Sequence, residues 1–376
     1  MTRRYLVISE FWPWYDDSGP SRRVGKFITA LSRAGTVDLY LLCRVAAPRS
    51  YPSPWRDLLD RFGTFVSYPR RGLLGRLRSP AEPPELPLRA DPRLRPSLTA
   101  WVRGHTYTAV WYAHESAWRQ SGRPAIGAAE VVDVPVRRDR LWEEWLASGE
   151  RPRGADGAVA RAAREWRSDL DALRGGGTAV TSRGAYDGAA HTRVGDTYPS
   201  LAVPQGAEPD GADLLFCGEL HRQENTEAAA WFVTHVMPAV RAKAGDARLH
   251  LYGRPAEPCD VLSRSPGTLL HDVAVPRAER MSQATVAVQP RLWGAWSQTD
   301  ALACLRFGLP LVASPGALDG LAACPTSAEA FADRVLALLG SPAARAESVD
   351  GARALLAGRP TEEADLDRIA EFFRAL

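Results

Sequence analysis

Short apolar segments alternate with amphipathic segments between residues 212 and 321, and this alternation restricts the fold more than any other feature. The apolar runs predict strands near 213–217, 248–252, 268–270, 285–288 and 310–313, each followed by a helical stretch. The runs end in a glycine, a proline or a polar turn, as strands do when a parallel sheet presents its loops along one edge. The pattern therefore predicts a doubly wound α/β sheet with a binding edge, but it does not name the ligand.

The first half of the chain repeats this organisation. Strands are predicted at 5–9, 37–43, 109–113, 130–134 and 178–182, with helices at 21–33, where Ser21 would be the N-cap, and at 156–173. A Pro- and Arg-rich segment at 70–96 opposes regular structure, which indicates a mobile loop or lid.

The length and one interruption of the pattern predict the domain organisation. A chain of 376 residues exceeds what one hydrophobic core normally serves, and the segment 204–211 interrupts all periodicity. We expect two Rossmann-like domains that face a central cleft, over residues 1–205 and 206–360. A terminal helix at 361–376 would then be free to pack back on the first domain.

Composition narrows the partners and the compartment. The net charge of +3 is spread along the chain without a basic block, so no nucleic-acid partner is expected. The five cysteines are far apart, which suits buried thiols in a reducing compartment, and no metal-binding cluster is visible. No apolar run reaches the roughly 18 residues of a membrane span, and none at the N-terminus suits a signal peptide. We therefore expect a cytoplasmic protein with no transmembrane segment, and we leave a homodimer open.

The order of several short motifs resembles the GT-B glycosyltransferases, specifically the retaining sugar transferases of family 4. They include Asp17-Ser18-Gly19, Phe216-Cys217-Gly218, Glu224 to Val233, Leu249 to Gly253 and Gly308-Leu309-Pro310, and together with further motifs they cover nearly the whole chain. The resemblance implies that the second domain binds a nucleotide-sugar donor and that the first binds an acceptor. Domain closure would expel water that could hydrolyse the donor.

The resemblance also implies where the donor binds. The diphosphate would contact Gly19 at a helix start, Gly218, and Arg222, which is the one cation close behind Gly218 in sequence. Arg222 could equally be a solvated surface arginine. The turn at Gly253 and the loop containing Val273 would contact the base, which leaves UDP-, GDP- and dTDP-sugars open. Beyond this substrate no cofactor is implied, and no metal is expected.

One departure from the family concerns the Glu-x7-Glu element that precedes the Gly-x-Pro turn. An ungapped alignment puts Ala295 and Ala303 at its two carboxylate positions, and neither side chain can accept a hydrogen bond. Asp300 lies one helical turn before Ala303, so with a small shift of register it could bind the ribose. Asp300 could instead simply cap the start of the helix.

The first domain also lacks the polar residue that family members often carry beyond the strand at 130–134. His114 and Asp133 are the polar groups left at that edge, and we regard both as candidate catalytic residues. His114 follows a predicted strand and could deprotonate an acceptor near neutral pH. A hydrogen-bonded structural histidine is the more common alternative.

Aromatic and polar residues gather in two predicted loops and could hold the sugar or the acceptor. The candidates are Trp14, Asp17, Trp293, Trp296, Ser297 and Gln298. Aromatic faces stack on sugar rings or flat acceptors, while carboxylate, hydroxyl and amide groups hold hydroxyls. Packing of the aromatic rings between the domains is the alternative interpretation.

Two functions are consistent with these observations. The first is an active, retaining glycosyltransferase with an atypical site, acting on a small molecule or glycan in an actinobacterial-type specialised or envelope pathway. The family implication is that retention needs no protein nucleophile, so the loss of carboxylates does not exclude catalysis. The second is a non-catalytic GT-B partner or scaffold of an active transferase. A weaker third option is a GT-B fold repurposed to bind a nucleotide sugar for another reaction.

Overall fold

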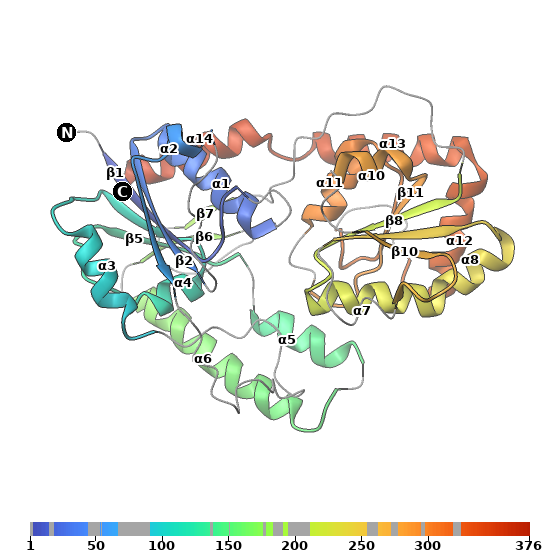
Figure 1. The fold of residues 1–376 in the computed structure, drawn as a ribbon, viewed down its shortest axis with the longest axis horizontal. Coiled ribbons are helices and arrows are strands. Elements are labelled where there is room, and N and C mark those ends of the chain that lie inside the picture. Colours follow the sequence, from blue (N-terminus) through green and yellow to red (C-terminus); the bar gives the residue numbers. More distant parts are fainter. Residues whose placement is uncertain are drawn as a thin grey trace. The chain divides into compact units, whose positions relative to one another are not determined.

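The computed structural model describes residues 3–14, 19–43, 53, 55–66, 91–135, 138–149, 151–175, 178–182, 191–194, 211–253, 262–271, 277–294, 298–318 and 325–376. The chain divides into two compact units (Figure 1). Unit 1 comprises residues 1–197 together with 360–376, and unit 2 comprises residues 198–359. Each unit contains its own parallel sheet.

Unit 1 contains a seven-stranded parallel sheet in the order β3-β2-β1-β4-β5-β6-β7. The strands are β1 (Arg4–Ser9), β2 (Thr36–Cys43), β3 (Arg61–Val66), β4 (Ala109–Tyr112), β5 (Ala129–Asp133), β6 (Ala179–Ser182) and β7 (His191–Arg193). The four strands β1, β2, β4 and β6 are almost entirely buried, as expected for a parallel sheet that is covered on both faces.

Helices connect these strands and supply the apolar faces that cover the sheet. They are α1 (Gly19–Ser32), α2 (Trp55–Leu58), α3 (Leu94–Val102), α4 (Glu115–Gln120), α5 (Arg138–Ala147), α6 (Ala155–Gly175) and α14 (Glu362–Ala375). In α1, Val24, Phe27, Ile28 and Leu31 recur at helical spacing and join the core. The ring of Phe27 stacks on Trp111 of β4, with their centroids 4.0 Å apart.

The last helix, α14, belongs to unit 1 although its sequence follows unit 2. Its residues Leu366, Ile369 and Phe373 are buried in the same core as α1, and Figure 1 shows the two helices side by side. Lys26 of α1 also donates to Asp365 of α14 across 2.6 Å, with both side chains buried. An apolar stripe and a buried ion pair thus tie the end of the chain to unit 1.

Unit 2 contains a five-stranded parallel sheet in the order β10-β9-β8-β11-β12. The strands are β8 (Asp213–Cys217), β9 (Arg248–Tyr252), β10 (Thr268–His271), β11 (Val286–Gln289) and β12 (Leu311–Ala313). The helical segments are α7 (Gln223–Trp231), the π-helix η2 (Phe232–Val236), α8 (Met237–Lys243), α10 (Arg277–Gln283), α11 (Thr299–Phe307), α12 (Ala328–Gly340) and α13 (Pro342–Ala357).

Alternate residues of the central strands of unit 2 enter two separate cores. Leu214 and Phe216 of β8 pack with residues of α7, η2, α8 and α12, whereas Leu215 and Cys217 pack with residues of α10, α11 and α13. This follows from the two-residue period of a strand, which sends successive side chains to opposite faces.

The strand order determines where each unit can bind a ligand. In an open parallel sheet the ligand crevice lies at the carboxyl ends of the strands, at the point where the strand order reverses. That point lies between β1 and β4 in unit 1, and between β8 and β11 in unit 2. The residues that follow these four strands are therefore the first to consider for binding.

The predicted strands and long helices are confirmed to within about two residues, and two local predictions are wrong. Helix α1 begins at Gly19, so Ser21 lies inside its first turn and is not its N-cap. The Pro-rich segment was predicted to be irregular up to residue 96, but α3 begins at Leu94. Pro96 lies in the first turn of α3, where no intrahelical partner exists for the backbone N–H that proline lacks. Residues 70–90 of that segment lie outside the described residues.

Candidate functional site

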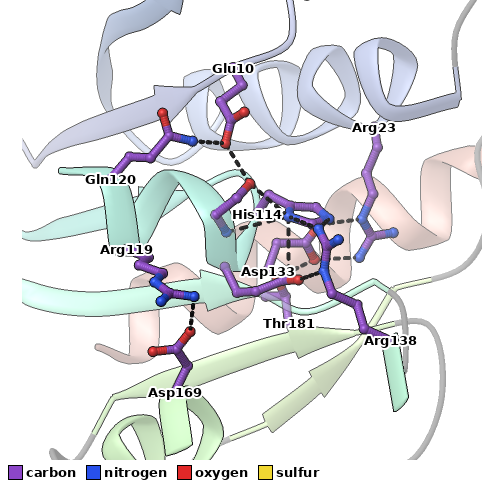
Figure 2. A network of polar contacts seen from close by, with 11 residues as sticks. Glu10, Arg23, His114, Arg119, Gln120, Asp133, Arg138, Asp169 and Thr181 are labelled. Carbon is purple, nitrogen blue, oxygen red and sulfur yellow. Dashed lines mark hydrogen bonds and ion pairs between the residues drawn. The ribbon is translucent and has the colours of Figure 1, made fainter. Parts of the chain in front are cut away.

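The switch point of unit 1 brings Glu10, after β1, close to His114, after β4 (Figure 2). Glu10 Oε1 accepts hydrogen bonds from the Ser116 hydroxyl and from Gln120 Nε2, the latter at 2.8 Å. Ser116 and Gln120 both lie on α4, the helix that starts directly after His114. Residues distant in sequence thus converge on one edge of the sheet.

The buried His114 ring lies within a polar cluster. Its Nδ1 atom is 3.0 Å from Ser116 Oγ and 3.0 Å from Glu115 Oε2. One guanidinium nitrogen of Arg138, NH2, lies 3.2 Å from Nδ1 and 3.4 Å from Nε2. The sequence prediction placed His114 at the strand end, and the structure adds these charged and hydroxyl partners.

Glu115 and Arg138 form a buried ion pair beside this ring, through Glu115 Oε1 and Arg138 Nε. Burial alone would raise the pKa of Glu115, but the positive charge of Arg138 and the contact with His114 lower it to about 2. Glu115 is therefore ionised at neutral pH. It brings a fixed negative charge next to the imidazole.

Asp133, the other candidate catalytic residue, is 1% exposed and takes part in a different interaction. Its two carboxylate oxygens accept hydrogen bonds from Arg23 Nε and NH2, each at 2.7 Å, and Thr181 Oγ1 donates to it at 2.8 Å. The fork of the guanidinium matches the carboxylate, which makes this a strong bidentate pair. Such contacts favour a structural role for Asp133, because proton transfer would have to break them.

The structure also describes two other predicted residues of unit 1, Gly19 and Trp14. Gly19 is the first residue of α1, so the helix begins where the prediction placed the anion contact. Trp14 is partly buried against the core, and its ring centroid lies 5.9 Å from that of Phe62. Packing therefore accounts for much of the Trp14 surface. Asp17 lies outside the described residues.

At the switch point of unit 2, the turn after β8 packs tightly against the turn after β9. The Gly218 N–H donates to the carbonyl of Tyr252 at 3.0 Å. A Cβ atom at Gly253 would lie 1.8 Å from the carbonyl oxygen of Gly218, so only glycine allows this approach. The two predicted glycines are thus neighbours. Because the Gly218 N–H already donates to the Tyr252 carbonyl, a ligand at this turn would have to bind other hydrogen-bond donors. Val273 lies outside the described residues.

Two arginines converge on one buried carboxylate beside this turn. Arg222 Nε donates to Glu224 Oε1 at 2.5 Å. Arg291, which follows β11, donates to Asn225 Oδ1 at 3.3 Å and to the Gly294 carbonyl at 3.1 Å. Burial would raise the pKa of Glu224, but Arg222 and Arg291 lower it below its usual value. The charges of Arg222, Arg291 and Glu224 therefore meet at the start of α7.

Asp300, the predicted ribose ligand, lies in the first turn of α11 and is paired with Arg277 of α10. Arg277 NH1 lies 2.9 Å from Asp300 Oδ1, and both side chains are largely buried. Burial would lower the pKa of Arg277, but the carboxylate of Asp300 raises it above its usual value. The carboxylate thus has a protein partner, and ribose would add to or replace this contact.

Two of the residues predicted to contact the sugar already have partners within unit 2. Trp293 is 2% exposed, and its indole N–H donates to Glu227 Oε2 at 2.8 Å. Gln298 Oε1 accepts a hydrogen bond from Arg359 NH2 at 3.0 Å. These contacts within unit 2 account for the positions of both side chains. Trp296 and Ser297 lie outside the described residues.

Among the described residues, no group of three or more His, Cys, Asp or Glu side chains could hold a metal ion. Cys43, Cys217 and Cys304 are buried free thiols, while Cys259 and Cys324 lie outside the described residues. No helix in the described part of the chain has both the length and the apolar character needed to cross a membrane.

Comparisons with known proteins identify the fold and a family match within unit 2. Residues 211–341 match the profile of the family described as "Glycosyl transferases group 1". The match spans the strands and turns that form the switch point of unit 2. The chain has the GT-B fold, and its residues 211–341 are similar to the group 1 glycosyl transferases. No curated protein matches its sequence.

Solved structures similar to this GT-B protein share its fold at low sequence identity. Sucrose-phosphate synthase from Thermosynechococcus elongatus has 16% identity and a TM-score of 0.66, with 99% of this chain and 98% of that one covered. Anabaena HepE in complex with UDP-glucose has 11% identity and a TM-score of 0.63, with 99% and 100% covered. A mutant of S. aureus TarM in complex with UDP has 11% identity and a TM-score of 0.50, with 73% of this chain and 57% of TarM covered.

The sequence interpretation missed three residues of the candidate site: Glu10, Ser116 and Arg291. Glu10 follows a predicted strand as His114 does, so its position was a usable signal. Arg291 lies 69 residues after Arg222 in sequence and reaches Asn225 at the start of α7 only because β8 and β11 are neighbours. That neighbourhood depends on the strand order, which single motifs do not specify.

Proposed function

We propose that this GT-B protein is a glycosyltransferase that binds a nucleoside diphosphate sugar at the switch point of unit 2. The observation that carries the proposal is the pair of arginines, Arg222 and Arg291, beside the Gly218 turn and the start of α7. Arginine forks and a helix N-terminus are both suited to phosphate oxygens. The family match over residues 211–341 supports the same assignment.

We infer that the donor is a UDP-sugar before the other candidates, because UDP or UDP-glucose is present in the structures of HepE and TarM. The turn at Gly253 would lie along the nucleoside, and Asp300 would bind the ribose if its contact with Arg277 opens. Departure of UDP would leave charge on its phosphate oxygens, and the two arginines would stabilise that charge. The glycosidic bond would form with retention of configuration.

The acceptor would bind unit 1, at the edge where Glu10 and His114 converge. The acceptor oxygen would bond to the anomeric carbon on the face from which UDP leaves, so that configuration is retained, and its proton would pass to His114 Nε2 as the bond to UDP breaks. Asp133 would act indirectly, because its pair with Arg23 holds β5 and α1 in place. Trp14 would border this edge.

Calorimetric titration with UDP, GDP and dTDP tests the donor assignment. We expect micromolar binding of one of them, with Arg222→Ala and Arg291→Ala each weakening it by about 1.5 to 3 kcal/mol. The matched control is Arg353→Ala, because Arg353 is an exposed arginine of α13 in the same unit. Equal affinities for all four proteins would remove both arginines from the site.

One observation favours the alternative, a non-catalytic GT-B partner of an active transferase. Asp300 and Arg222 are both engaged by protein charges, at 2.9 and 2.5 Å respectively, which is how a vestigial donor site would be neutralised. This alternative expects no heat from any of the three nucleotides and no release of UDP from UDP-sugars. Binding together with UDP release that depends on an added acceptor would exclude it.

A further inference from the structure

Two histidines of unit 2 contact each other on neighbouring strands. His250 lies in the middle of β9, and His271 is the last residue of β10, an edge strand of the sheet. The His250 Nδ1 atom lies 2.9 Å from His271 Nε2, and the two rings are nearly parallel, with their centroids 5.0 Å apart. The His250 Nε2 atom lies 3.0 Å from Oδ1 of Asp213, the first residue of β8. Three neighbouring strands thus contribute to one chain of polar contacts.

Asp213 determines where His250 carries a hydrogen. Arg248 donates to both carboxylate oxygens of Asp213, at 2.8 and 2.9 Å. Burial would raise the pKa of Asp213, but the hydrogen bonds from Arg248 and His250 lower it below its usual value. An ionised carboxylate can only accept hydrogen bonds, so the His250 Nε2 atom must carry a hydrogen.

The contact between the two rings therefore depends on how many protons the pair carries. In the neutral pair, Nδ1 of His250 has a lone pair and accepts the hydrogen on Nε2 of His271. One added proton, on Nδ1 of His271, leaves this hydrogen bond intact. A second added proton puts a hydrogen on both of the facing nitrogens, so the bond is lost and two positive charges adjoin.

The surroundings of the pair make the second proton difficult to add. Among the described residues, the neighbouring charged and titratable groups include Asp213 on β8, Arg248 and Tyr252 on β9, and Arg280 on α10. Burial, the positive charge of Arg280 and the neighbouring His250 lower the pKa of His271 below its usual value. Asp213 favours a proton on His250, and Arg248 offsets part of that effect. The second step should therefore lie below the ordinary titration range of histidine, which is centred near pH ~6.5.

The end of β10 also holds the turn at Gly253. The Gly253 N–H donates to the His271 carbonyl at 3.4 Å, and His271 pairs with Tyr252 in the strand register. The last three residues of β10 are exposed or half-buried, and β9 is its strand neighbour in the sheet. The contact between the rings therefore helps to fix the end of β10 against β9, and through the His271 carbonyl it bears on the turn.

We propose that His250 and His271 are positioning residues for the donor: their contact holds the Gly253 turn while the pair carries at most one added proton, and a second proton releases it. This inference rests on the proposed function, in which the turn lies along the nucleoside. The holding contact is present at neutral pH and is lost as the pH falls through the second step. Unit 2 would therefore lose affinity for the nucleotide in acid because of a change in the protein.

Nitrogen-15 NMR of the full-length protein, labelled at histidine and glycine, tests the proton chain without nucleotide. The ring signals are assigned by their loss in His250→Gln and in His271→Gln. At neutral pH we expect a pyrrole-type Nε2 and a pyridine-type Nδ1 in His250. On acidification the pair should take up its protons in two separate steps, and the amide signal of Gly253 should shift with the second. The exposed His235 of η2 should titrate in one step. A pyridine-type Nε2 in His250, or a Gly253 amide that ignores the second step, would overturn the inference.

Calorimetric titration with UDP at about pH 7.5 and about pH 5 tests the positioning role. UDP itself takes up a proton over this range, because the second pKa of a phosphate is about 6, so the comparison is between proteins. His271→Gln keeps a neutral N–H donor for His250, and His250→Gln keeps one for Asp213, but neither glutamine can become charged. We expect the parent to lose about 5-fold more affinity in acid than either variant, the effect of one neutral hydrogen bond.

The matched control is His235→Gln, which removes an exposed histidine of the same unit whose Nδ1 faces the Trp231 carbonyl at 3.0 Å. A pH dependence that is reduced in both glutamine variants of the pair and retained in His235→Gln supports the inference. Equal pH dependence in all four proteins, with UDP bound, would refute the positioning role and leave the proposed function intact. Failure of UDP, GDP and dTDP to bind at either pH would refute the proposed function and, with it, the role of the pair at the donor site.

Discussion

Removal of the Asp133 carboxylate, in Asp133→Ala, should destabilise unit 1 strongly. The Asp133 and Arg23 side chains are 1% and 3% exposed, and the change leaves the guanidinium of Arg23 buried without its counterion. Breaking a buried pair by removing one partner costs about 3 to 5 kcal/mol. Arg23 keeps a bond to the Val194 carbonyl at 3.3 Å, so we expect the lower half of that range. Because native domains are stable by only about 5 to 15 kcal/mol, unit 1 would lose a large share of its stability.

The double variant Arg23→Met, Asp133→Leu isolates the electrostatic part of this effect. Replacing both charges by apolar side chains of similar volume is often neutral or stabilising, so we expect the double variant to lie within about 1 kcal/mol of the parent. The two residues should therefore show strong non-additivity. The weak contact of Arg23 with the Phe27 ring, at 5.3 Å, is lost in the double variant and gives only a small correction.

Amide hydrogen exchange is the suitable assay because the two units need not unfold together. The slowest amides of β5 and β6 report the opening free energy of unit 1, and those of β8 and β9 report unit 2 as an internal control. A change below about 1 kcal/mol in Asp133→Ala, or a double variant less stable than the single one, would refute the buried-pair argument. A catalytic role would instead show as loss of turnover in Asp133→Asn with exchange unchanged.

Three further changes test other parts of the structure. Phe373→Ala should lower the unfolding free energy of unit 1 by about 3 to 5 kcal/mol in the same exchange assay, while the exposed Leu376→Ala should have no effect. The pKa of Glu115, lowered from 4.5 to about 2 in the folded protein, contributes stability above pH 4.5 that is lost as the pH falls toward 2, and Glu115→Gln should flatten this acid dependence. Gly253→Ala should weaken UDP binding at least ~10-fold in calorimetry, because its Cβ would displace the carbonyl of Gly218.

Most of the sheet structure could be predicted because buried parallel strands read as continuous apolar runs. The strands missed by the sequence interpretation are edge-side elements with weak signals. β3 has one buried residue among six, at Gly63, and β7 has only three residues. Neither reaches the length and apolar content that distinguish a strand from a loop.

The candidate site could be predicted only where a residue directly follows a strand or belongs to a family motif. His114 and Arg222 met one of these conditions. The roles of their partners could not be predicted, because Glu10 and Arg291 approach them across the reversal of strand order. The sequence also gave no sign that Asp300 would be paired with Arg277, since the two lie on different helices, α10 and α11.

Glu224 and a bound phosphate would compete for Arg222. The guanidinium cannot bind phosphate with all its nitrogens while its Nε atom donates to Glu224. Arg291 also donates hydrogen bonds to two neutral groups, Asn225 Oδ1 and the Gly294 carbonyl. A diphosphate carries more charge than the single carboxylate of Glu224, and each bond from a charged donor contributes about 1.5 to 3 kcal/mol. A bound diphosphate can therefore compete with Glu224 for the guanidinium of Arg222. Glu224 would then orient Arg222 toward the phosphate while lowering its affinity for anions in general.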